Sequence, residues 1–251
     1  MKQNTDYIFG IRAVIEAILA GKDIDKILVR KDLSGELSDE LFQMLKGRAD
    51  IFVQRVPLER INRITRKNHQ GVVAFLSPVA YHKLDHLVPD LFEQGRNPLL
   101  VLLDGITDVR NFGAIARTCE CAGVDALVIP ERNSVSVNAD AVKTSAGALL
   151  HLPVARVGSL HQAIRYLKDC GYTIVGSTEK SDKNYTEFDY TVPTAIVMGA
   201  EDTGISMENL RLCDHLAAIP MSGKVNSLNV SVAAGIMIYE VVRQRINDAS
   251  L

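Results

Sequence analysis

The segment from Gly199 to Gly204, which reads Gly-Ala-Glu-Asp-Thr-Gly, follows an apolar run and precedes a helix signal. Two glycines at this spacing are typical of a phosphate-binding loop, in which Lys and then Ser or Thr follow the second glycine. Here Ile205 and Ser206 follow it, so the cation that reaches the β- and γ-phosphates of a nucleotide is missing. This argues against nucleoside triphosphate binding. The glycines still let a ligand approach backbone N–H and C=O groups closely, and an ordinary strand-to-helix turn is the alternative.

Asn111 and Arg117 form a second candidate pair, six residues apart at the start of a predicted helix. Six residues correspond to about 600° of helical rotation, so the two side chains point about 120° apart and would line adjacent faces of one site. The planar guanidinium of arginine can pair with two phosphate oxygens, which suits Arg117 to anchoring a phosphate. The alternatives are a helix cap for Asn111 and a surface ion pair of Arg117 with Glu120 or Asp125.

The run Asn226-Ser-Leu-Asn-Val-Ser231 lies where a helix is predicted to begin, over residues 227–246. Ser227 and Asn229 are both good caps, but capping needs only one of them, and the run offers more hydrogen-bonding groups than a cap uses. The helix itself is apolar on nearly every face from Val230 to Val242. A protein core or a second subunit must therefore cover it on several sides.

Three motifs occur in order along the chain: Asn111-Phe-Gly-Ala-Ile-Ala-Arg117, Val197-Met-Gly-Ala-Glu-Asp-Thr-Gly204, and Ile219-Pro-Met followed by Asn226-Ser-Leu-Asn-Val230. Together they resemble the signature motifs of the SpoU group of SPOUT RNA 2′-O-ribose methyltransferases, over about residues 99 to 247. The N-terminal part, with Ile8-Phe-Gly-Ile-Arg-Ala-Val-Ile-Glu16 and His69-Gln-Gly-Val-Val73, is similar to the substrate domain of the 23S rRNA (guanosine-2′-O)-methyltransferase branch.

This resemblance implies S-adenosylmethionine as the cofactor. The cofactor-binding residues that it implies are Met198, Gly199, Gly204, Ile219, Pro220, Met221, Ser227 and Leu228. The catalytic residues that it implies are Asn111, Arg117, Glu201, Ser227 and Asn229. Arg117 would bind or activate the target nucleotide, and the others would orient ribose and cofactor. Because arginine is effectively always protonated, phosphate anchoring is favoured over a general-base role for Arg117. The resemblance also implies a homodimer, with an interface that includes helices 111–122 and 227–246.

Composition describes a globular chain and does not by itself announce a nucleic-acid partner. The 251 residues are 47% hydrophobic, with a net charge of −2. Residues 1–80 hold 13 Lys and Arg against 10 Asp and Glu, while residues 81–251 hold 15 against 20, so the N-terminal part is the better electrostatic match for RNA. No apolar run approaches a membrane span, no signal-peptide pattern is present, and no His, Cys and carboxylate cluster has metal-ligand spacing. We therefore expect a cytoplasmic protein without a membrane segment or a metal.

Alternating helix and strand signals predict an α/β protein of two domains. Residues 1–78 predict a small three-layer α/β domain, for which the resemblance implies an RNA-binding fold like that of a ribosomal protein. Residues 77–98 contain three of the eight prolines together with turn signals. A linker is expected over 79–98, with a short helix from Leu84 to Phe92 lying on one of the domains. Over residues 99–251, near-continuous Val, Ile and Leu runs predict a mostly parallel sheet covered on both faces. The resemblance adds a trefoil knot to this domain.

A helix predicted after Pro57 carries Arg60, Arg63 and Lys67, which are spaced three and four residues apart and so share one face. Contact with RNA phosphates and a merely solvated face are the two alternatives. With His69 in the following turn, these three residues are the candidate RNA-binding residues.

The resulting prediction is transfer of a methyl group from S-adenosylmethionine to the ribose 2′-OH of a guanosine in 23S rRNA. A sugar hydroxyl is a poor nucleophile at neutral pH, so the site must position it and help to remove its proton. A tRNA ribose methyltransferase is the alternative within the class, because only the N-terminal domain favours rRNA. An inactive RNA-binding or ribosome-assembly protein is the alternative from another class, and the intact motifs argue against it.

Overall fold

The computed structural model describes residues 7–46, 48, 51–225 and 227–248. Residues up to Ala80 form one compact unit, and nearly all residues from Tyr81 onward form another. We refer to them as the N-terminal unit and the C-terminal unit and describe each by itself.

The N-terminal unit is built on a four-stranded sheet with the strand order β1-β4-β2-β3. The strands are β1 (Tyr7–Phe9), β2 (Ile24–Arg30), β3 (Phe52–Val56) and β4 (Val72–Leu76). Strand β4 runs antiparallel to β1 and β2, whereas β2 and β3 are parallel. The helices are α1 (Ile11–Leu19), α2 (Glu36–Leu45) and α3 (Leu58–Asn62).

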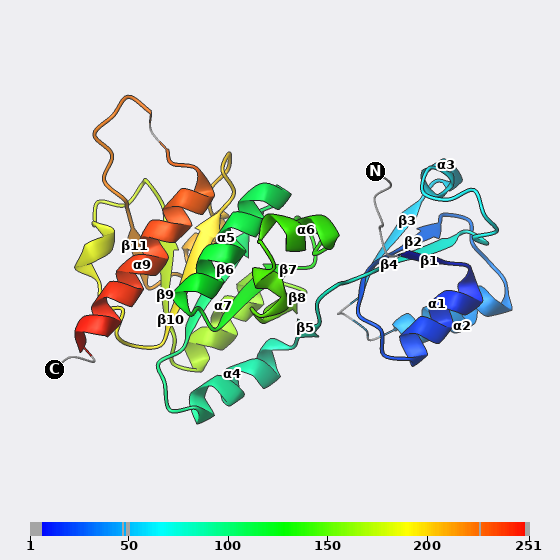
Figure 1. The fold of residues 1–251 in the computed structure, drawn as a ribbon, viewed down its shortest axis with the longest axis horizontal. Coiled ribbons are helices and arrows are strands. Elements are labelled where there is room, and N and C mark those ends of the chain that lie inside the picture. Colours follow the sequence, from blue (N-terminus) through cyan, green and yellow to red (C-terminus); the bar gives the residue numbers. More distant parts are fainter. Residues whose placement is uncertain (1–6, 47, 49–50, 226, 249–251) are drawn as a thin grey trace. The chain divides into compact units, whose positions relative to one another are not determined.

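Helices cover both faces of this sheet (Figure 1). Helices α1 and α2 pack on one face, in an apolar cluster that includes Ile15, Leu41 and Val72. Helix α3 packs on the other face, where its Ile61 contacts a smaller cluster that includes Val73. Residues 72 and 73 serve opposite faces because side chains alternate along a strand. The three-layer arrangement predicted from the sequence is confirmed.

The C-terminal unit is built on a seven-stranded sheet with the order β11-β9-β10-β6-β7-β8-β5. All six strand pairs are parallel. The strands are β5 (Tyr81–His82), β6 (Leu99–Asp104), β7 (Ala126–Pro130), β8 (Val154–Val157), β9 (Thr173–Ser177), β10 (Thr194–Gly199) and β11 (His215–Ala217). The central strands are buried on both faces, as the continuous apolar runs predict, and the α/β class with a parallel sheet is confirmed.

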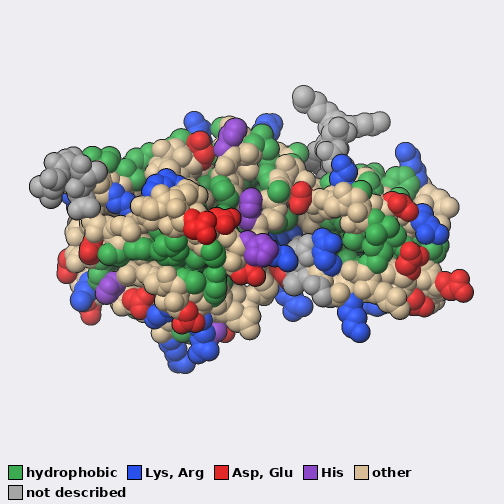
Figure 2. Space-filling view, turned by 90° about the horizontal axis from the view of Figure 1, so that it is seen from below, with side chains coloured by type: hydrophobic (Ala, Val, Ile, Leu, Met, Phe, Trp, Pro, Cys, Tyr) green, Lys and Arg blue, Asp and Glu red, His purple; other side chains and the backbone are tan. Residues whose placement is uncertain are grey.

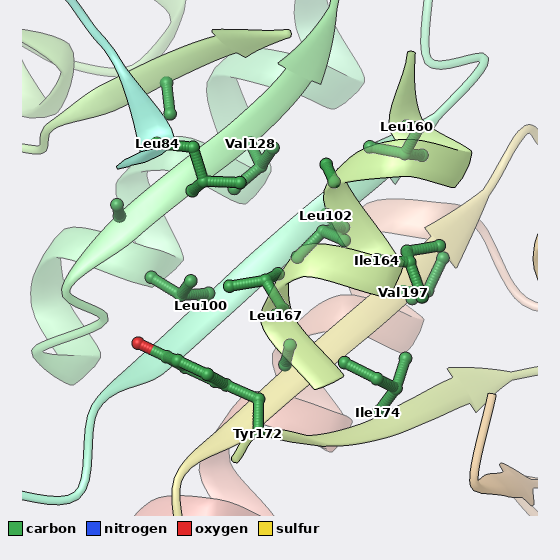
Figure 3. Packing of buried hydrophobic residues seen from close by; sticks show 14 of the residues in the cluster. Leu84, Leu100, Leu102, Val128, Leu160, Ile164, Leu167, Tyr172, Ile174 and Val197 are labelled. Atoms are coloured by element: carbon green, nitrogen blue, oxygen red, sulfur yellow. The ribbon is translucent and has the colours of Figure 1, made fainter. Parts of the chain in front are cut away.

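Six α-helices and two short 3-10 helices surround this sheet within the described residues. They are α4 (Leu84–Glu93), α5 (Val109–Ala122), α6 (Ala139–Thr144), η1 (Ala148–Leu150), α7 (Leu160–Asp169), η2 (Tyr185–Glu187), α8 (Met207–Leu210) and α9 (Val230–Asp248). Helix α7 places Leu160, Ile164 and Leu167 on one side, and they pack against Leu102 and Val197 of the sheet (Figure 3). Figure 1 shows α5 and α9 side by side, in front of the sheet.

The stretch 79–98, expected as a linker, contains β5 and α4. Helix α4 buries Leu84, Val88 and Leu91 in the same cluster as α7. These positions are spaced four and three residues apart, which is the apolar pattern of an amphipathic helix. Pro89 lies inside α4. Most of this stretch therefore packs into the C-terminal unit as regular structure.

Charged side chains of both signs are interspersed on the face that Figure 2 shows, in keeping with the net charge of −2. Within the residues that the structure describes, no helix is both long and apolar enough to cross a membrane.

Arg245, near the end of α9, forms hydrogen bonds with the segment before β10. Its guanidinium donates to the carbonyl oxygens of Tyr190 (3.0 Å), Val192 (3.0 Å) and Asn97 (2.6 Å). The neighbouring Gln244 donates to the carbonyl of Phe188 at 3.0 Å. One guanidinium thus satisfies three backbone acceptors from two separate segments.

Arg245→Ala is expected to lower the free energy of unfolding by about 2–4 kcal/mol, because three charge-assisted hydrogen bonds are lost and their carbonyls are left without that donor. Arg245→Lys should recover only part, since an ammonium lacks the planar fork. Urea denaturation measures this, with Arg211→Ala as the control: Arg211 is exposed, and its side chain forms no hydrogen bond or ion pair within the described part of the chain. Equal midpoints for both alanine variants would contradict the assignment.

Candidate active site

The carboxyl ends of β9, β10 and β11 open onto a cavity of about 340 Å³. The segments that follow the three strands line it, together with the first turn of α9. Ligand sites in parallel α/β sheets lie at this edge of the sheet. A volume of this size is in the range of small-molecule sites.

Seven of the eight residues predicted to bind a cofactor line this cavity. They are Met198, Gly199, Gly204, Ile219, Met221, Ser227 and Leu228. The eighth, Pro220, is exposed and does not line it. Its two neighbours in the chain do, which agrees with the alternating side-chain directions of an extended segment. Asn226, part of the third motif, lies outside the described residues.

Residues 177–180, which follow β9, also line the cavity, and sequence reasoning did not single them out. This segment contains Thr178, Glu179 and Lys180. The sequence did predict the strand that precedes it. The missing information was the strand order, which places β9 between β10 and β11 and so brings its carboxyl end to the same cavity.

The loop between Gly199 and Gly204 is a tight turn in which the backbone after Gly204 folds back closely onto Gly199. Ala200 and Gly204 exchange two backbone hydrogen bonds, of 3.2 and 2.8 Å. Gly204 has a φ of +68°, and a Cβ added at Gly199 would come within 2.1 Å of the backbone of Gly204 and Ile205. Glycine is therefore required at Gly199 for the loop to fold back on β10.

Side chains from the three motifs meet in one polar cluster, formed by Asn111, Glu201 and Asn229. Asn111 Nδ2 donates to Glu201 Oε2 at 3.2 Å, and Asn229 Nδ2 donates to Glu201 Oε1 at 3.4 Å. Asn229 Nδ2 also donates to Asn111 Oδ1 at 3.0 Å, across 118 residues of sequence. The fold thus joins the loop after β10 to the first turns of α5 and α9.

Asn229 both caps α9 and joins this cluster. Its Oδ1 accepts a hydrogen bond from the backbone N–H of Ser231 at 3.0 Å, which is the pattern of a capping side chain. Its Nδ2 remains free to reach the cluster. Ser227 lines the cavity instead of capping. Asn229 therefore serves both as a helix cap and as a member of the cluster, whereas Ser227 belongs to the cavity alone.

Asn111 is not the first residue of its helix. Helix α5 begins at Val109, and Asp108 is its cap, accepting hydrogen bonds from the N–H groups of Arg110 (2.8 Å) and Asn111 (2.9 Å). The side chain of Asn111 is thereby released from capping. It lies in the first turn of α5 and points to the cluster.

A second cavity, of about 370 Å³, adjoins the polar cluster. Residues 105–108 and Asn111 line it on one side. It shares Glu201 and Val230 with the first cavity. The cluster therefore stands between two spaces, each large enough for part of a ligand.

Arg117 lies on α5 outside both cavities. Its side chain is exposed, and it forms no hydrogen bond or ion pair with any residue that the structure describes. The predicted alternative partner Asp125 is engaged elsewhere, with Arg96 at 3.0 Å and the N–H of Leu99 at 2.7 Å. The structure therefore supplies no surface ion pair for Arg117.

The three basic candidates for RNA binding, Arg60, Arg63 and Lys67, do not lie on one helix. Helix α3 ends at Asn62, so Arg60 lies on it, Arg63 caps its end, and Lys67 lies beyond it. His69 is buried, with its Nδ1 accepting from the N–H of Gly71 and its Nε2 donating to Asn62 Oδ1, each at 2.9 Å. Both ring nitrogens of His69 are thus used within the fold. No group of three or more His, Cys, Asp or Glu that could hold a metal occurs in the described part of the chain.

Comparison with known proteins identifies relatives along nearly the whole chain. The profile of the SpoU rRNA methylase family matches residues 98–239, and that of the RNA 2′-O ribose methyltransferase substrate-binding domain matches residues 7–82. A Staphylococcus saprophyticus protein assigned to the TrmH family of tRNA/rRNA methyltransferases is 40% identical over 238 residues, 95% of each chain. Bacillus subtilis YacO, with the same assignment, is 34% identical over 245 residues, 98% of each chain.

Solved structures show the same architecture. The SpoU methyltransferase AviRb from Streptomyces viridochromogenes, crystallised in complex with AdoMet, has a TM-score of 0.61 and 27% identity, over 96% of this chain and 90% of that one. An AdoMet-bound rRNA methyltransferase from Sinorhizobium meliloti gives 0.61 and 27%, over 94% and 86%. A family profile that covers more than half of the chain, and relatives that match it along nearly their whole length, identify it: this chain belongs to the SpoU rRNA methylase family of RNA methyltransferases.

Proposed function

We propose that this chain transfers the methyl group of S-adenosylmethionine to the ribose 2′-OH of a guanosine in 23S rRNA, in the cytoplasm. One observation carries the proposal: Asn111, Glu201 and Asn229 form a single hydrogen-bonded cluster at the border of two cavities. An enzyme that joins a cofactor to an RNA sugar needs polar groups between two adjacent binding spaces.

The first cavity fits S-adenosylmethionine. Met198, Ile219 and Leu228 supply apolar surface for an adenine ring. The loop at Gly199, where no Cβ can be accommodated, presents backbone groups at close range, which suits hydrogen bonds to a base edge. The cofactor supplies an activated methyl group on a sulfonium. Two relatives were crystallised with this cofactor, which supports the same ligand here.

The chain's own residues then position the nucleophile. In this proposal the amide and carboxylate groups of the polar cluster, with the Ser227 hydroxyl, hold the ribose and the cofactor in line. Proximity and orientation of this kind account for a large share of the rate enhancement in such transfers. Arg117 is exposed and its side chain has no partner among the residues that the structure describes, so it is available to anchor the phosphate of the target nucleotide.

The N-terminal unit supports RNA as the substrate in this proposal. It matches a substrate-binding domain, and Arg60 and Arg63 are exposed at α3. The choice of 23S rRNA rests on the resemblance of this unit, and tRNA is the second candidate, since the relatives are assigned to tRNA/rRNA methyltransferases. An inactive binding protein is disfavoured because the polar cluster is complete. A trefoil-knotted path of the C-terminal chain belongs to the same proposal.

A homodimer is part of the proposal, and α9 supports it. Its exposed apolar side chains Val232 (50% exposed), Tyr239 (50%) and Ile246 (61%) are spaced seven residues apart. Seven residues make about two turns, so the three side chains form one stripe along the helix. A stripe of this kind on an ordered helix is typical of an interface.

Sedimentation equilibrium is therefore expected to give about twice the 27.5 kDa mass of the chain. Tyr239→Asp should shift the equilibrium toward monomer, because a carboxylate would be buried in an apolar interface. The control is Leu19→Asp, an exposed leucine of α1 in the other unit. A monomeric wild-type protein with full activity would refute the dimer.

The function is tested by two measurements. Calorimetric titration with S-adenosylmethionine, with a metal chelator present, should show binding. Mapping of 2′-O-methyl groups on rRNA and tRNA, with and without the gene, should show one guanosine of 23S rRNA that loses its mark. No binding of the cofactor at millimolar concentration would overturn the proposal, and a lost mark on tRNA alone would select the second candidate.

A further inference from the structure

The two faces of the N-terminal sheet are covered unequally. Helix α3 has five residues and is about 7–8 Å long, whereas the seven residues of β2 extend over about 23 Å. Two longer helices, α1 and α2, close the opposite face with aliphatic side chains. Helix α3 therefore covers only part of its face, around Ile61 and Val73.

Three aromatic rings occupy the part of this face nearest the sheet edge. Tyr7 and Phe9 are two residues apart on β1 and so point to the same side. Phe75 of β4 is the register partner of Tyr7. The ring centroid of Tyr7 lies 6.3 Å from that of Phe9 and 6.1 Å from that of Phe75, and the ring planes are tilted relative to one another. All three side chains are only partly buried.

Two ammonium groups lie over these rings. Lys26 Nζ is 5.0 Å from the ring centroid of Phe75, and Lys67 Nζ is 5.7 Å from that of Phe9. Lys26 stands beside Phe75 in the register of β2 and β4. Two cations thus lie over three neighbouring rings on this face, whereas the larger cluster on the opposite face is closed mainly by aliphatic side chains of α1 and α2.

The chain around the patch is basic as well. Between residues 60 and 67 it holds Arg60, Arg63, Arg66 and Lys67 and no acidic residue. Aromatic rings that are interleaved with cations bind single-stranded nucleic acid, because the bases stack on the rings while the cations pair with phosphates. An acidic protein partner would use the cations and an apolar partner would use the rings, but neither would need cations interleaved with rings.

We infer that Tyr7, Phe9 and Phe75, with Lys26 and Lys67, form a binding surface for unpaired nucleobases of the RNA substrate. This inference rests on the proposed function and refines it. It predicts that the substrate presents a single-stranded loop or bulge to the N-terminal unit. The phosphates of that strand pair with Lys67 and Arg63, and the ring faces hold its bases.

The full chain carries no tryptophan, which permits a direct test. Phe75→Trp places one indole in the patch, and its fluorescence should be quenched when a short single-stranded RNA binds. Phe42→Trp is the matched control, since Phe42 also has a cation over its ring, Arg55 at 4.7 Å, but belongs to the α1 and α2 side of the sheet. Quenching in the first variant alone supports the inference, and equal quenching, or none in either, overturns it.

Affinity gives an independent test. Phe75→Leu is expected to weaken binding of single-stranded RNA about 5- to 20-fold with an unchanged salt dependence, because a stacking contact is lost and no phosphate contact is. Lys67→Met should lower the salt slope by about one unit. Phe42→Leu should change neither. Equal affinities of Phe75→Leu and Phe42→Leu, or tighter wild-type binding to duplex than to single strands, would overturn the inference.

The same preparations are titrated with S-adenosylmethionine and assayed for methyl transfer. Wild-type protein that binds the cofactor and methylates RNA, combined with an unaffected Phe75→Leu variant, would refute the base-binding surface alone. Absence of cofactor binding in the wild type would refute the proposed function instead.

Discussion

Replacing Arg117 by alanine is expected to slow single-turnover methyl transfer on the order of 10²-fold or more. Its guanidinium is exposed and has no protein partner within the described residues, so folding has no evident use for it. In the proposed reaction it anchors the phosphate of the target nucleotide and so aligns the ribose. Affinity for S-adenosylmethionine should stay near the wild-type value, since Arg117 does not line the cofactor cavity. The melting temperature should also stay unchanged.

Arg165→Ala is the matched control for this prediction, because Arg165 is also an exposed arginine on a helix of the same unit without a partner in the described structure. Arg117→Lys should rescue turnover poorly, since an ammonium cannot make the two-pronged contact with a phosphate. Near-normal turnover of Arg117→Ala on rRNA fragments would remove this residue from the mechanism.

Secondary structure of the C-terminal unit was predictable because each parallel strand is covered on both faces and therefore reads as a short apolar run. Helix starts were less predictable. Thr107, Asp108 and Asn111 are all capping types, and only the structure shows that Asp108 caps α5 and leaves Asn111 to the site. The prolines suggested a linker over 79–98, and the short helix expected within it from Leu84 to Phe92 corresponds to α4 (Leu84–Glu93).

The extent of α3 illustrates a local conflict. The charges of Arg60, Arg63 and Lys67 have helical spacing, yet the helix ends at Asn62. Thr65 Oγ1 accepts from the N–H of Lys67, and a side chain that bonds the backbone in this way competes with helix formation. The bond from His69 to Asn62 also holds the following turn. The spacing of the charged residues alone gave no sign that these side-chain hydrogen bonds would end the helix.

The least predictable feature was that Asn111, Glu201 and Asn229 meet in space. Asn111 and Glu201 are 90 residues apart, and Asn111 and Asn229 are 118 apart. Only the strand order, with β10 between β9 and β6, brings their segments together, and residue spacing does not reveal that order. Resemblance to a family supplied the site as a set of residues. Hydrogen bonds in the structure join three of these residues, Asn111, Glu201 and Asn229, in one cluster.

Glu201→Gln is expected to reduce methyl transfer on the order of 10²-fold, even though it preserves size and shape, because the polar cluster has a fixed direction. Asn229 cannot turn its amide round, since its Oδ1 accepts from the backbone N–H of Ser231. Its Nδ2 therefore faces Asn111 Oδ1 and Glu201 Oε1, which in turn directs Asn111 Nδ2 at Glu201 Oε2. Residue 201 must accept at both oxygens, and glutamine has only one. An amide donor would then face another donor.

The combined exchange Asn111→Asp with Glu201→Gln separates geometry from charge. It keeps the total charge of the cluster and reverses one hydrogen bond, so that residue 201 donates and residue 111 accepts, while both still accept from Asn229. If the hydrogen-bond network positions the ribose, the double variant should recover at least about tenfold over Glu201→Gln alone, which is about 1.4 kcal/mol of activation free energy. Glu208→Gln, an exposed glutamate of α8, serves as the control in the same single-turnover assay. No recovery in the double variant would show that the carboxylate itself is needed at residue 201, and would overturn the network as the reason for its effect.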